Sequence, residues 1–323
     1  MSTGRYLLNR FLQAIPLLIG AVIINFLILH GAPGEPTDYL IGQASVDQVF
    51  VDRLKAELGL DRPLYVQLWK FLLKASSGDL GYSFVSGAPV LTLIMERFPT
   101  TLLLMGSQYA LSALLGILLG VLSSRKPNSF LDNSVTVFSL AGFAIPIFWL
   151  GQMFILILGY QLNWFPLQGM VNLRQMYTGF AYVLDVAYHM ALPALTLTLY
   201  NMALIVRLTR GSMLQVLGQE YITVARSKGL SEGKVLMKHA LRNALLPVVT
   251  VIGLNFRTLI AGAVLTETVF AWPGLGRLTF DAIHARDYPL LMGMFVFTCI
   301  LVVIGNLITD FIYSLIDPRI RYQ

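Results

Sequence analysis

The stretch TTLLLMGSQYALSALLGILLGVL, residues 100–122, decides the fold because it contains no charged residue. An α-helix rises about 1.5 Å per residue, so about 20 apolar residues cross the hydrocarbon core of a membrane. The composition of the whole chain supports a membrane-spanning helix here, since 56% of its 323 residues are hydrophobic and only 12% are charged. Soluble domains are about 25% charged, so the composition excludes a soluble globular enzyme and a disordered chain.

Five further apolar segments have the length of a membrane span. The sequence therefore predicts an all-α polytopic membrane protein with six transmembrane helices: 11–29, 100–122, 135–160, 189–206, 245–265 and 290–315. The first is too long for the core of a signal peptide, and no small-x-small cleavage site follows it, so we expect it to be retained. The predicted division is 1–30 for the N-terminus and first span, 31–98 for an external segment, and 99–323 for a five-helix core.

Basic residues predict the orientation of these spans. With the N-terminus in the cytoplasm, the inner loops and ends carry thirteen Lys and Arg residues, seven of them between Arg207 and Arg242. The two short outer loops carry only Arg174, Arg277 and Arg286. Because positive loops stay inside, both termini are predicted to be cytoplasmic. The placement of the basic residues on the inner side of the membrane accounts for the net charge of +6, so no nucleic-acid partner is expected.

The external segment 31–98 contains signals for a small helical insertion after the first span. Ser45 with Gln48 forms a capping-box pattern that predicts a helix over 46–58, which Gly59 ends. Pro63 suits the first turn of a second helix, which we expect to run to about Leu73. The glycines of GDLGYS, residues 78–83, predict a turn. At this size the segment is more simply a cap on the helix ends than an independent domain.

The cytoplasmic segment 208–243 is far longer than a tight turn. It contains GQEYITVARSKGLSEGKVLMKHALRNALLP, residues 218–247, of which 220–228 are predicted to be helical. Gly229 would end this helix and Ser231 would cap the next one, giving two short amphipathic helices. From composition alone, such a pair could bind another protein or lie on anionic lipid.

Chemical motifs of enzymes are missing from the sequence. GLSEGK, residues 229–234, is one residue too short for a phosphate-binding loop, and Val235 replaces the required Ser or Thr. The four histidines are scattered, so we expect no metal site, and no catalytic residue is identified. A membrane-embedded enzyme is therefore disfavoured. An ion-driven secondary transporter would show an inverted repeat with broken helices, which the sequence lacks.

Residues 218–247 resemble the cytoplasmic loop of permease subunits of binding-protein-dependent ABC importers, and most closely the dipeptide/oligopeptide branch. That branch reads E-Y-(I/V)-x-x-A-R-x-K-G and then H-x-L-R-N-A-L-L-P. The general importer motif fits less well, because Thr223 replaces an acidic residue and Arg242 replaces a proline. The resemblance extends in order through DRPLYVQ (61–67), GDLGYS, IPIFWLG (145–151), TETVFAWPGLGRL (266–278), ARDYPL (285–290) and DPRIR (317–321). The matching positions of the loop are Glu220, Tyr221, Ile222, Ala225, Arg226, Lys228, Gly229, His239, Leu241, Arg242, Asn243 and Pro247.

This resemblance implies a type I ABC importer permease in the bacterial inner membrane. It implies a second homologous permease subunit, two ATP-binding subunits that hold ATP and Mg²⁺, and a periplasmic substrate-binding protein. The chain itself is then expected to need no cofactor and to catalyse no reaction. The substrate would be a dipeptide or oligopeptide, with nickel chelates, glutathione and opines as alternatives known from related permeases.

Candidate site residues fall into three groups. The resemblance places ATPase docking on the cytoplasmic loop, where small residues permit close backbone approach and Tyr221 can fill a pocket. Within the fifth span, Arg257 with Asn255 is a candidate for the substrate pathway, and a structural ion pair with the partner permease is the alternative. On the receptor side, the AWPGLG loop and nearby charges are candidates for receptor contact. The residues are Glu220, Tyr221, Ala225, Arg226, Gly229 and Leu230 for docking; Arg257 and Asn255 for the pathway; and Trp272, Pro273, Gly274, Asp281, Arg286 and Asp287 for the receptor side.

Overall fold

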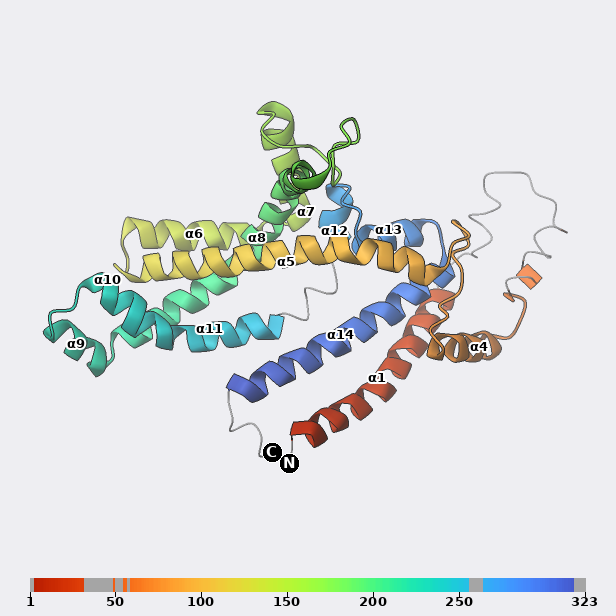
Figure 1. The fold of residues 1–323 in the computed structure, drawn as a ribbon, viewed down its shortest axis with the longest axis horizontal. Helices are drawn as coiled ribbons and strands as arrows, with labels where there is room; N and C mark the ends of the chain where they lie inside the picture. Colours follow the sequence, from red (N-terminus) through yellow and green to blue (C-terminus); the bar gives the residue numbers. More distant parts are fainter. Residues whose placement is uncertain (1–2, 32–48, 50–54, 57–58, 256–263, 317–323) are drawn as a thin grey trace. The chain divides into compact units, whose positions relative to one another are not determined.

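The computed structural model describes residues 3–31, 49, 55–56, 59–255 and 264–316. Within these residues every regular element is a helix. The chain divides into two compact units, which are described separately (Figure 1). The first comprises residues 1–101, 260–264 and 273–323, and the second comprises 102–259 and 265–272.

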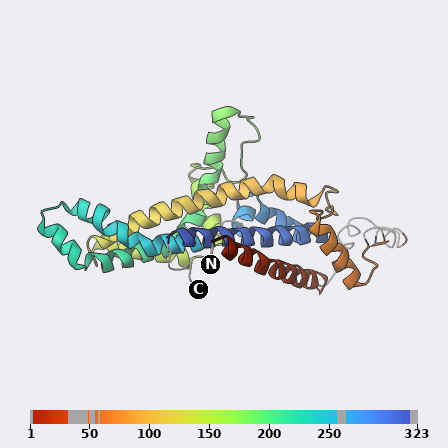
Figure 2. The ribbon, with the colours of Figure 1, turned by 60° about the horizontal axis from the view of Figure 1, so that its bottom comes forward.

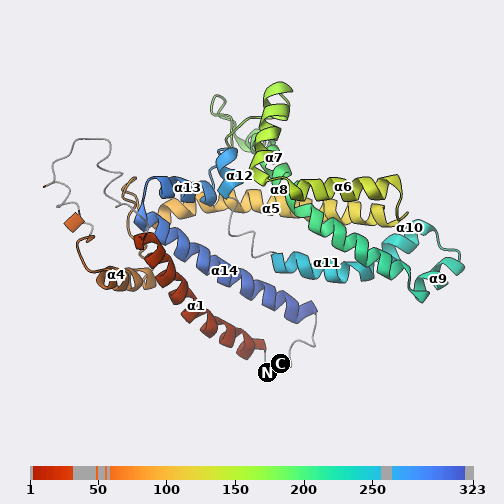
Figure 3. The same ribbon diagram turned by 180° about the vertical axis from the view of Figure 1, so that it is seen from behind.

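In the first unit, α1 (Thr3–Gly31) packs along α14 (Tyr288–Ile316), as Figures 1 and 3 show. The unit also contains α4 (Leu64–Ser76), the start of α5 (Val90–Ser124) and α13 (Leu275–His284). Its apolar core joins α1, α14 and the start of α5 through Phe26, Leu291 and Ile94, which are all buried. Residues from the two ends of the sequence therefore form one core.

In the second unit, the remainder of α5 lies against α8 (Gly179–Leu217), and α8 also packs against α6 (Phe130–Ala144), α7 (Ile147–Phe154) and α11 (Leu241–Asn255). The approach of α5 to α8 depends on glycines. A Cβ added at Gly116 would lie 2.7 Å from Ile205, and one at Gly120 would lie 2.6 Å from Thr209. Small residues permit such close helix packing in membranes.

Among the described residues, four helices are long and apolar enough to cross a membrane: Val90–Ser124, Gly179–Leu217, Glu232–Gly253 and Tyr288–Leu307. A fifth span is possible if Phe130–Ala144 and Ile147–Gln161 count together, although they meet at 105°. The bend has a local cause, because the backbone of Ile145 is extended (φ −78°, ψ 132°), as residues before proline prefer. The all-α polytopic fold class is confirmed.

The predicted count of six spans stays a prediction. The first predicted span, 11–29, lies within α1, and the apolar part of α1 among the described residues is Ile15–Gly31. The fifth predicted span, 245–265, begins in α11 and continues into residues 256–263, which lie outside the described residues. Arg257 is one of these residues. The helix predicted over 46–58 also lies mostly outside them.

The rest of the external segment follows the sequence pattern. The helix predicted after Pro63 is confirmed as α4, with Pro63 at its N-cap. Gly78 and Gly81 adopt positive φ angles of 83° and 82°, which form the turn predicted at GDLGYS. The following helix, α5, begins at Val90, so it starts inside the predicted segment 31–98 and continues into the second span.

Candidate functional site

A short helix, α9 (Glu220–Ser227), connects α8 to the next long helix. Gln219 is its N-cap and Lys228 its C-cap. Gly229 follows with φ +76°, and its N–H donates to the carbonyl of Arg226 over 2.9 Å. Glycine adopts this left-handed conformation without steric cost, so it ends the helix as the sequence predicts. Figure 2 shows α9, in teal, at the far end of α8.

The inner face of α9 is fixed to the rest of the second unit. Ile222 is fully buried and Ala225 is 6% exposed. Both belong to an apolar cluster with Val121 of α5, Met213 of α8 and residues of the segment 235–244. Burial of this face holds α9 against three longer helices, so a force applied to α9 reaches all of them.

The outer face of α9 is apolar in part but remains exposed. Tyr221 is 41% exposed and Val224 is 53% exposed, and Met237 on the neighbouring helix is 60% exposed. The hydroxyl of Tyr221 accepts a hydrogen bond from Nδ2 of Asn243 over 2.7 Å, which orients the ring. Val224 and Met237 were missed in the sequence because neither carries a recognisable motif.

An ion pair closes the connection after α9. Arg226 donates from Nη2 to Oε1 of Glu232 over 2.7 Å and from Nε to Oε2 over 3.3 Å. The carboxylate of Glu232 raises the pKa of the Arg226 guanidinium above its ordinary value. Both side chains are about half exposed, so the pair stabilises the connection only weakly. The predicted docking residue Arg226 thus has a partner within its own chain.

The region differs from the expected pair of short helices. Ser231 is at an N-cap position, as predicted, but its side chain makes no capping hydrogen bond. From there α10 (Glu232–Lys234), the π-helix η2 (Val235–Ala240) and α11 form a continuous helix, because no residue between them breaks it. Similarly, α8 extends to Leu217, so its last ten residues lie in the predicted loop. Only residues 218–231 connect the two long helices.

The predicted docking residues therefore have two kinds of environment. Glu220, Tyr221, Arg226 and Gly229 are exposed. Ala225 is buried in the apolar cluster, and Leu230 is half-buried against it. A Cβ added at Gly229 would meet no atom of the described part of the chain within 4 Å, so the space beside this residue is open there. The small side chain of Ala225 therefore allows close packing inside the chain. The open space that a partner protein could approach lies at Gly229 instead.

The receptor-side candidates are mostly involved in contacts within the chain. In the second unit Trp272 is fully buried, and its backbone N–H donates to the backbone carbonyl of Glu267 over 2.8 Å. In the first unit Gly274 is buried at the N-cap of α13, and the carbonyl of Pro273 accepts from Thr100 Oγ1. Asp281 is exposed, and Arg286 is half-buried with φ +51°.

Asp287 has a structural environment that its sequence position did not indicate. It is 1% exposed. Its carboxylate accepts from Leu290 N (3.3 Å) at the start of α14, and from Ser83 Oγ and Phe84 N (3.1 Å) in the external turn. Its carboxylate therefore holds the first turn of α14 and the turn near residue 83 together.

A second buried carboxylate, Asp132, was not recognised in the sequence. It is 1% exposed at the start of α6. Arg210 of α8 binds it through Nε (2.6 Å) and Nη2 (2.7 Å), and Ser123 Oγ and Asn128 N complete its hydrogen bonds. This cluster joins the end of α5 to α6 and α8. Among the described residues, no three His, Cys, Asp or Glu side chains form a metal-ligand cluster.

Comparison with known proteins identifies the family of this all-helical chain. Residues 114–322 match the family described as binding-protein-dependent transport system inner membrane component. Residues 3–105 match the N-terminal region of such membrane components. The chain belongs to this family. It is therefore a multi-pass inner-membrane permease subunit of a binding-protein-dependent importer, and the family resemblance seen in its sequence is confirmed.

Relatives of this permease match nearly its full length. The oligopeptide transport system permease protein AppB of Bacillus subtilis is 43% identical, over 98% of this chain and 99% of the relative. The dipeptide transport system permease protein DppB of Escherichia coli is 39% identical, over 99% of each. A solved structure of the MetNI methionine ABC transporter, in an inward-facing conformation, is similar in fold, with 18% identity and a TM-score of 0.54 over 70% of this chain and 97% of that one.

Proposed function

We propose that this permease forms half of the translocation pathway of an ATP-driven importer for dipeptides or oligopeptides. Near-complete matches to peptide permeases such as AppB and DppB support this substrate class. A periplasmic binding protein delivers the peptide, and a second homologous permease subunit forms the other half of the pathway. Two partner subunits bind and hydrolyse ATP with Mg²⁺, so this chain itself holds no cofactor.

The exposed face of α9 is the proposed docking surface for a partner ATPase. This assignment is supported by the two faces of α9: the inner face is buried at Ile222, and the outer face is exposed at Tyr221 and Val224. Because residues 218–231 directly connect two long helices, movement of α9 displaces the ends of α8 and of the helix beginning at Glu232. Closure of the ATPases thereby changes the packing of the permease helices.

The orientation proposed here has both termini and α9 in the cytoplasm. The distribution of basic residues supports it, because the segment 207–242 is strongly positive. Asn255 ends α11, and Arg257 follows it within the fifth predicted span. A guanidinium in that span is costly unless it faces protein or water, so we assign both residues to the wall of the pathway. Exposed residues on the receptor side, such as Asp281, are assigned to contact with the binding protein.

Two substitutions of Gly229 test the docking proposal. Gly229→Ala and Gly229→Trp place a side chain at the same φ of +76°, which costs about 1–2 kcal/mol for a residue other than glycine. Neither Cβ meets an atom of the described residues within 4 Å. Only tryptophan extends far into the open space. We expect both variants to insert normally, and only the tryptophan variant to lose co-purifying ATPase and peptide uptake.

The matched control is Gly87→Trp. Gly87 also has a positive φ (67°), and a Cβ there would meet no atom of the described residues within 4 Å, but Gly87 lies in the external segment. This variant should retain the ATPase. Normal ATPase co-purification with Gly229→Trp would refute docking at α9. Uptake of labelled dipeptides by cells that depend on this permease tests the substrate separately, and its absence would refute only the peptide assignment.

A further inference from the structure

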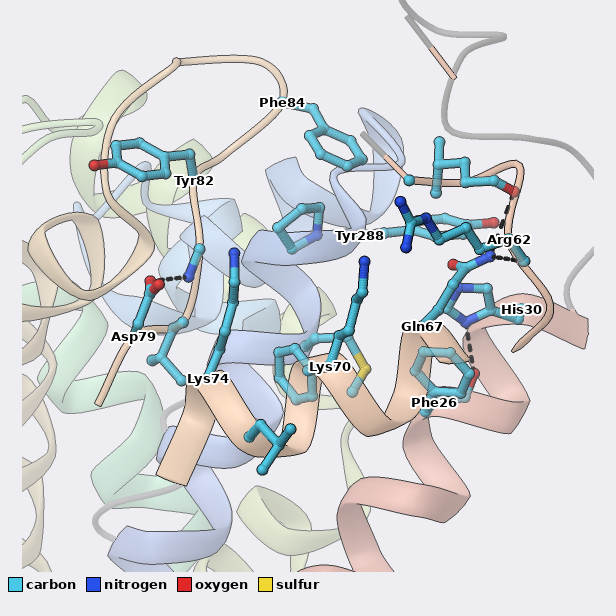
Figure 4. A pocket seen from close by; sticks show the side chains of 18 of the residues that line it. Phe26, His30, Arg62, Gln67, Lys70, Lys74, Asp79, Tyr82, Phe84 and Tyr288 are labelled. Carbon is cyan, nitrogen blue, oxygen red and sulfur yellow. Dashed lines mark hydrogen bonds between the residues drawn. The ribbon is translucent and has the colours of Figure 1, made fainter. Parts of the chain in front are cut away.

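A pocket of about 810 Å³ lies within the first unit. It is bounded by the C-terminal end of α1, one side of α4, the turn at residues 79–84 and the first turn of α14. Figure 4 shows Lys70 and Lys74 next to each other on α4, with their amine ends directed toward the loop that carries Tyr82 and Phe84. None of these features takes part in the proposed docking of an ATPase.

Most of the charged side chains that line the pocket are positive. Arg62, Lys70 and Lys74 line it, and among the described residues Asp79 is the one acidic residue of the lining. Asp79 already accepts a hydrogen bond from Gly81 N over 2.9 Å. Lys70 and Lys74 are four residues apart on a helix, where like charges repel each other. Within the described ranges, no carboxylate forms an ion pair with either lysine, so the pocket favours an anionic group.

The opposite side of the pocket is apolar. Phe26, Phe71 and Met292 contribute to it, together with Tyr288. The ring of His30 stacks on Phe26 with centroids 3.9 Å apart, and its Nδ1 is 2.9 Å from the carbonyl oxygen of Phe26. A ligand that fits both sides therefore combines a negative head with an apolar body.

The outer face of α4 is unusually apolar for a helix outside a membrane span. Leu64, Tyr65, Trp69 and Leu73 are 49%, 75%, 63% and 55% exposed. The other side of α4 already packs against the apolar core through residues that include Phe71. Leu73 also lines the pocket, so the exposed face and the pocket are continuous. Exposed Trp and Tyr beside lysines are typical of helices at a membrane surface.

The position of α4 agrees with that environment. The pocket that α4 borders is also lined by Phe26 and His30, which lie in the last turns of α1. Because the first predicted span ends at residue 29, Phe26 and His30 lie near the boundary of the membrane, and the basic-residue pattern places this boundary outside. An apolar helix face at this depth meets the headgroup region of the outer leaflet.

We propose that α4 lies in the outer-leaflet interface and that the pocket binds the phosphate of an anionic phospholipid from this leaflet. The ammonium groups of Lys70 and Lys74 hold the phosphate, with Arg62 at the rim. The acyl chains continue past Leu73 along the exposed face of α4. This lipid anchors the external segment to the membrane beside α1 and α14.

Lipid analysis of the purified importer tests the headgroup site. The complex is reconstituted with phosphatidylcholine and phosphatidylglycerol and re-extracted in mild detergent, and retained lipid is measured by mass spectrometry. We expect retained phosphatidylglycerol with the native chain and with Lys70→Arg/Lys74→Arg, and its loss with Lys70→Gln/Lys74→Gln. Arg174→Gln, which removes an exposed charge from another outer loop, should retain the lipid. Equal retention in the glutamine double variant, or displacement of the lipid by inorganic phosphate, would overturn the lipid site.

Spin labelling tests the position of α4. A label on Trp69→Cys in a Cys299→Ala chain should be more accessible to oxygen than to a water-soluble nickel chelate in phosphatidylglycerol-containing vesicles. A label on Arg174→Cys serves as the aqueous reference. A label at residue 69 that matches this reference would overturn the interfacial placement. Protection from nickel that requires the binding protein would instead identify α4 as a receptor surface and also overturn the proposal.

Discussion

Replacement of Asp132 by asparagine should destabilise the permease strongly. Oδ1 of Asp132 accepts from Ser123 Oγ and Arg210 Nε, and Oδ2 accepts from Asn128 N and Arg210 Nη2. An asparagine preserves the volume but turns one of these oxygens into an NH₂ group that faces two donors. Two of the four hydrogen bonds are then lost, and Arg210 loses its charged partner.

The expected cost follows from burial. Breaking a buried ion pair costs about 3–5 kcal/mol, since the remaining charge is left without compensation. The Arg210 side chain is 28% exposed, so water relieves part of this cost. We therefore expect about 3 kcal/mol for Asp132→Asn, at the lower end of that range.

The matched control is the pair Arg226–Glu232. Its shortest N–O distance is 2.7 Å, close to the 2.6 Å of Arg210–Asp132, but its side chains are 45% and 52% exposed. Glu232→Gln should therefore cost less than about 1 kcal/mol. The measurement is denaturant-induced unfolding of the purified complex, with Arg210→Met and the double variant Asp132→Asn/Arg210→Met completing a double-mutant cycle.

The double variant should be more stable than the sum of the two single effects predicts, by about 0.5–3 kcal/mol, because it leaves no isolated charge. The reasoning is refuted if Asp132→Asn destabilises the complex no more than Glu232→Gln. It is also refuted if the two single effects simply add, since the residues would then not be coupled.

Three further predictions concern packing, the pathway and topology. Gly293→Ala places a Cβ 2.3 Å from Val90 Cγ1 and should lower the free energy of unfolding by about 1–3 kcal/mol, measured by thermal unfolding. Gly20→Ala is the control, because its Cβ meets no atom of the described residues within 4 Å, and it should not destabilise the permease. Equal effects of the two substitutions would contradict the packing of Gly293 against Val90. Arg257→Leu should abolish peptide uptake while preserving assembly, because a pathway residue is not needed to join the subunits; lost assembly would indicate an ion pair with the partner permease. Reporter fusions should place residues 31–98 outside and 218–231 inside, and a cytoplasmic signal from the first loop would reject the orientation.

Hydropathy predicted the presence of the helices better than their ends. The span predicted over 189–206 lies within α8, which continues from Gly179 to Leu217. A helix does not end where it leaves the apolar core of the membrane, so composition marks the membrane-crossing part alone. The helix end at Gly229 could be predicted because its cause is local: glycine tolerates the positive φ that ends a helix.

Interactions between distant residues could not be predicted in the same way. Asp132 and Arg210 are 78 residues apart, and Tyr221 and Asn243 are 22 apart. Each residue alone is an ordinary polar side chain, and only the packing of the helices shows which of them meet. For the same reason the sequence predicts Asp287 as a receptor-contact residue, whereas the fold buries it.

The contacts of Asp287 determine when the first unit can be completed during synthesis. Ser83 must wait for a partner 204 residues further along the chain, and α1 waits for α14. At about 5–20 residues per second, translation of that interval takes on the order of 10–40 s. During this time the nascent N-terminal helix lacks its partner, and insertion factors or lipid must cover its apolar surface. A ribosome that stops before residue 287 therefore leaves a protein whose earliest segments cannot assemble, which exposes them to membrane proteases.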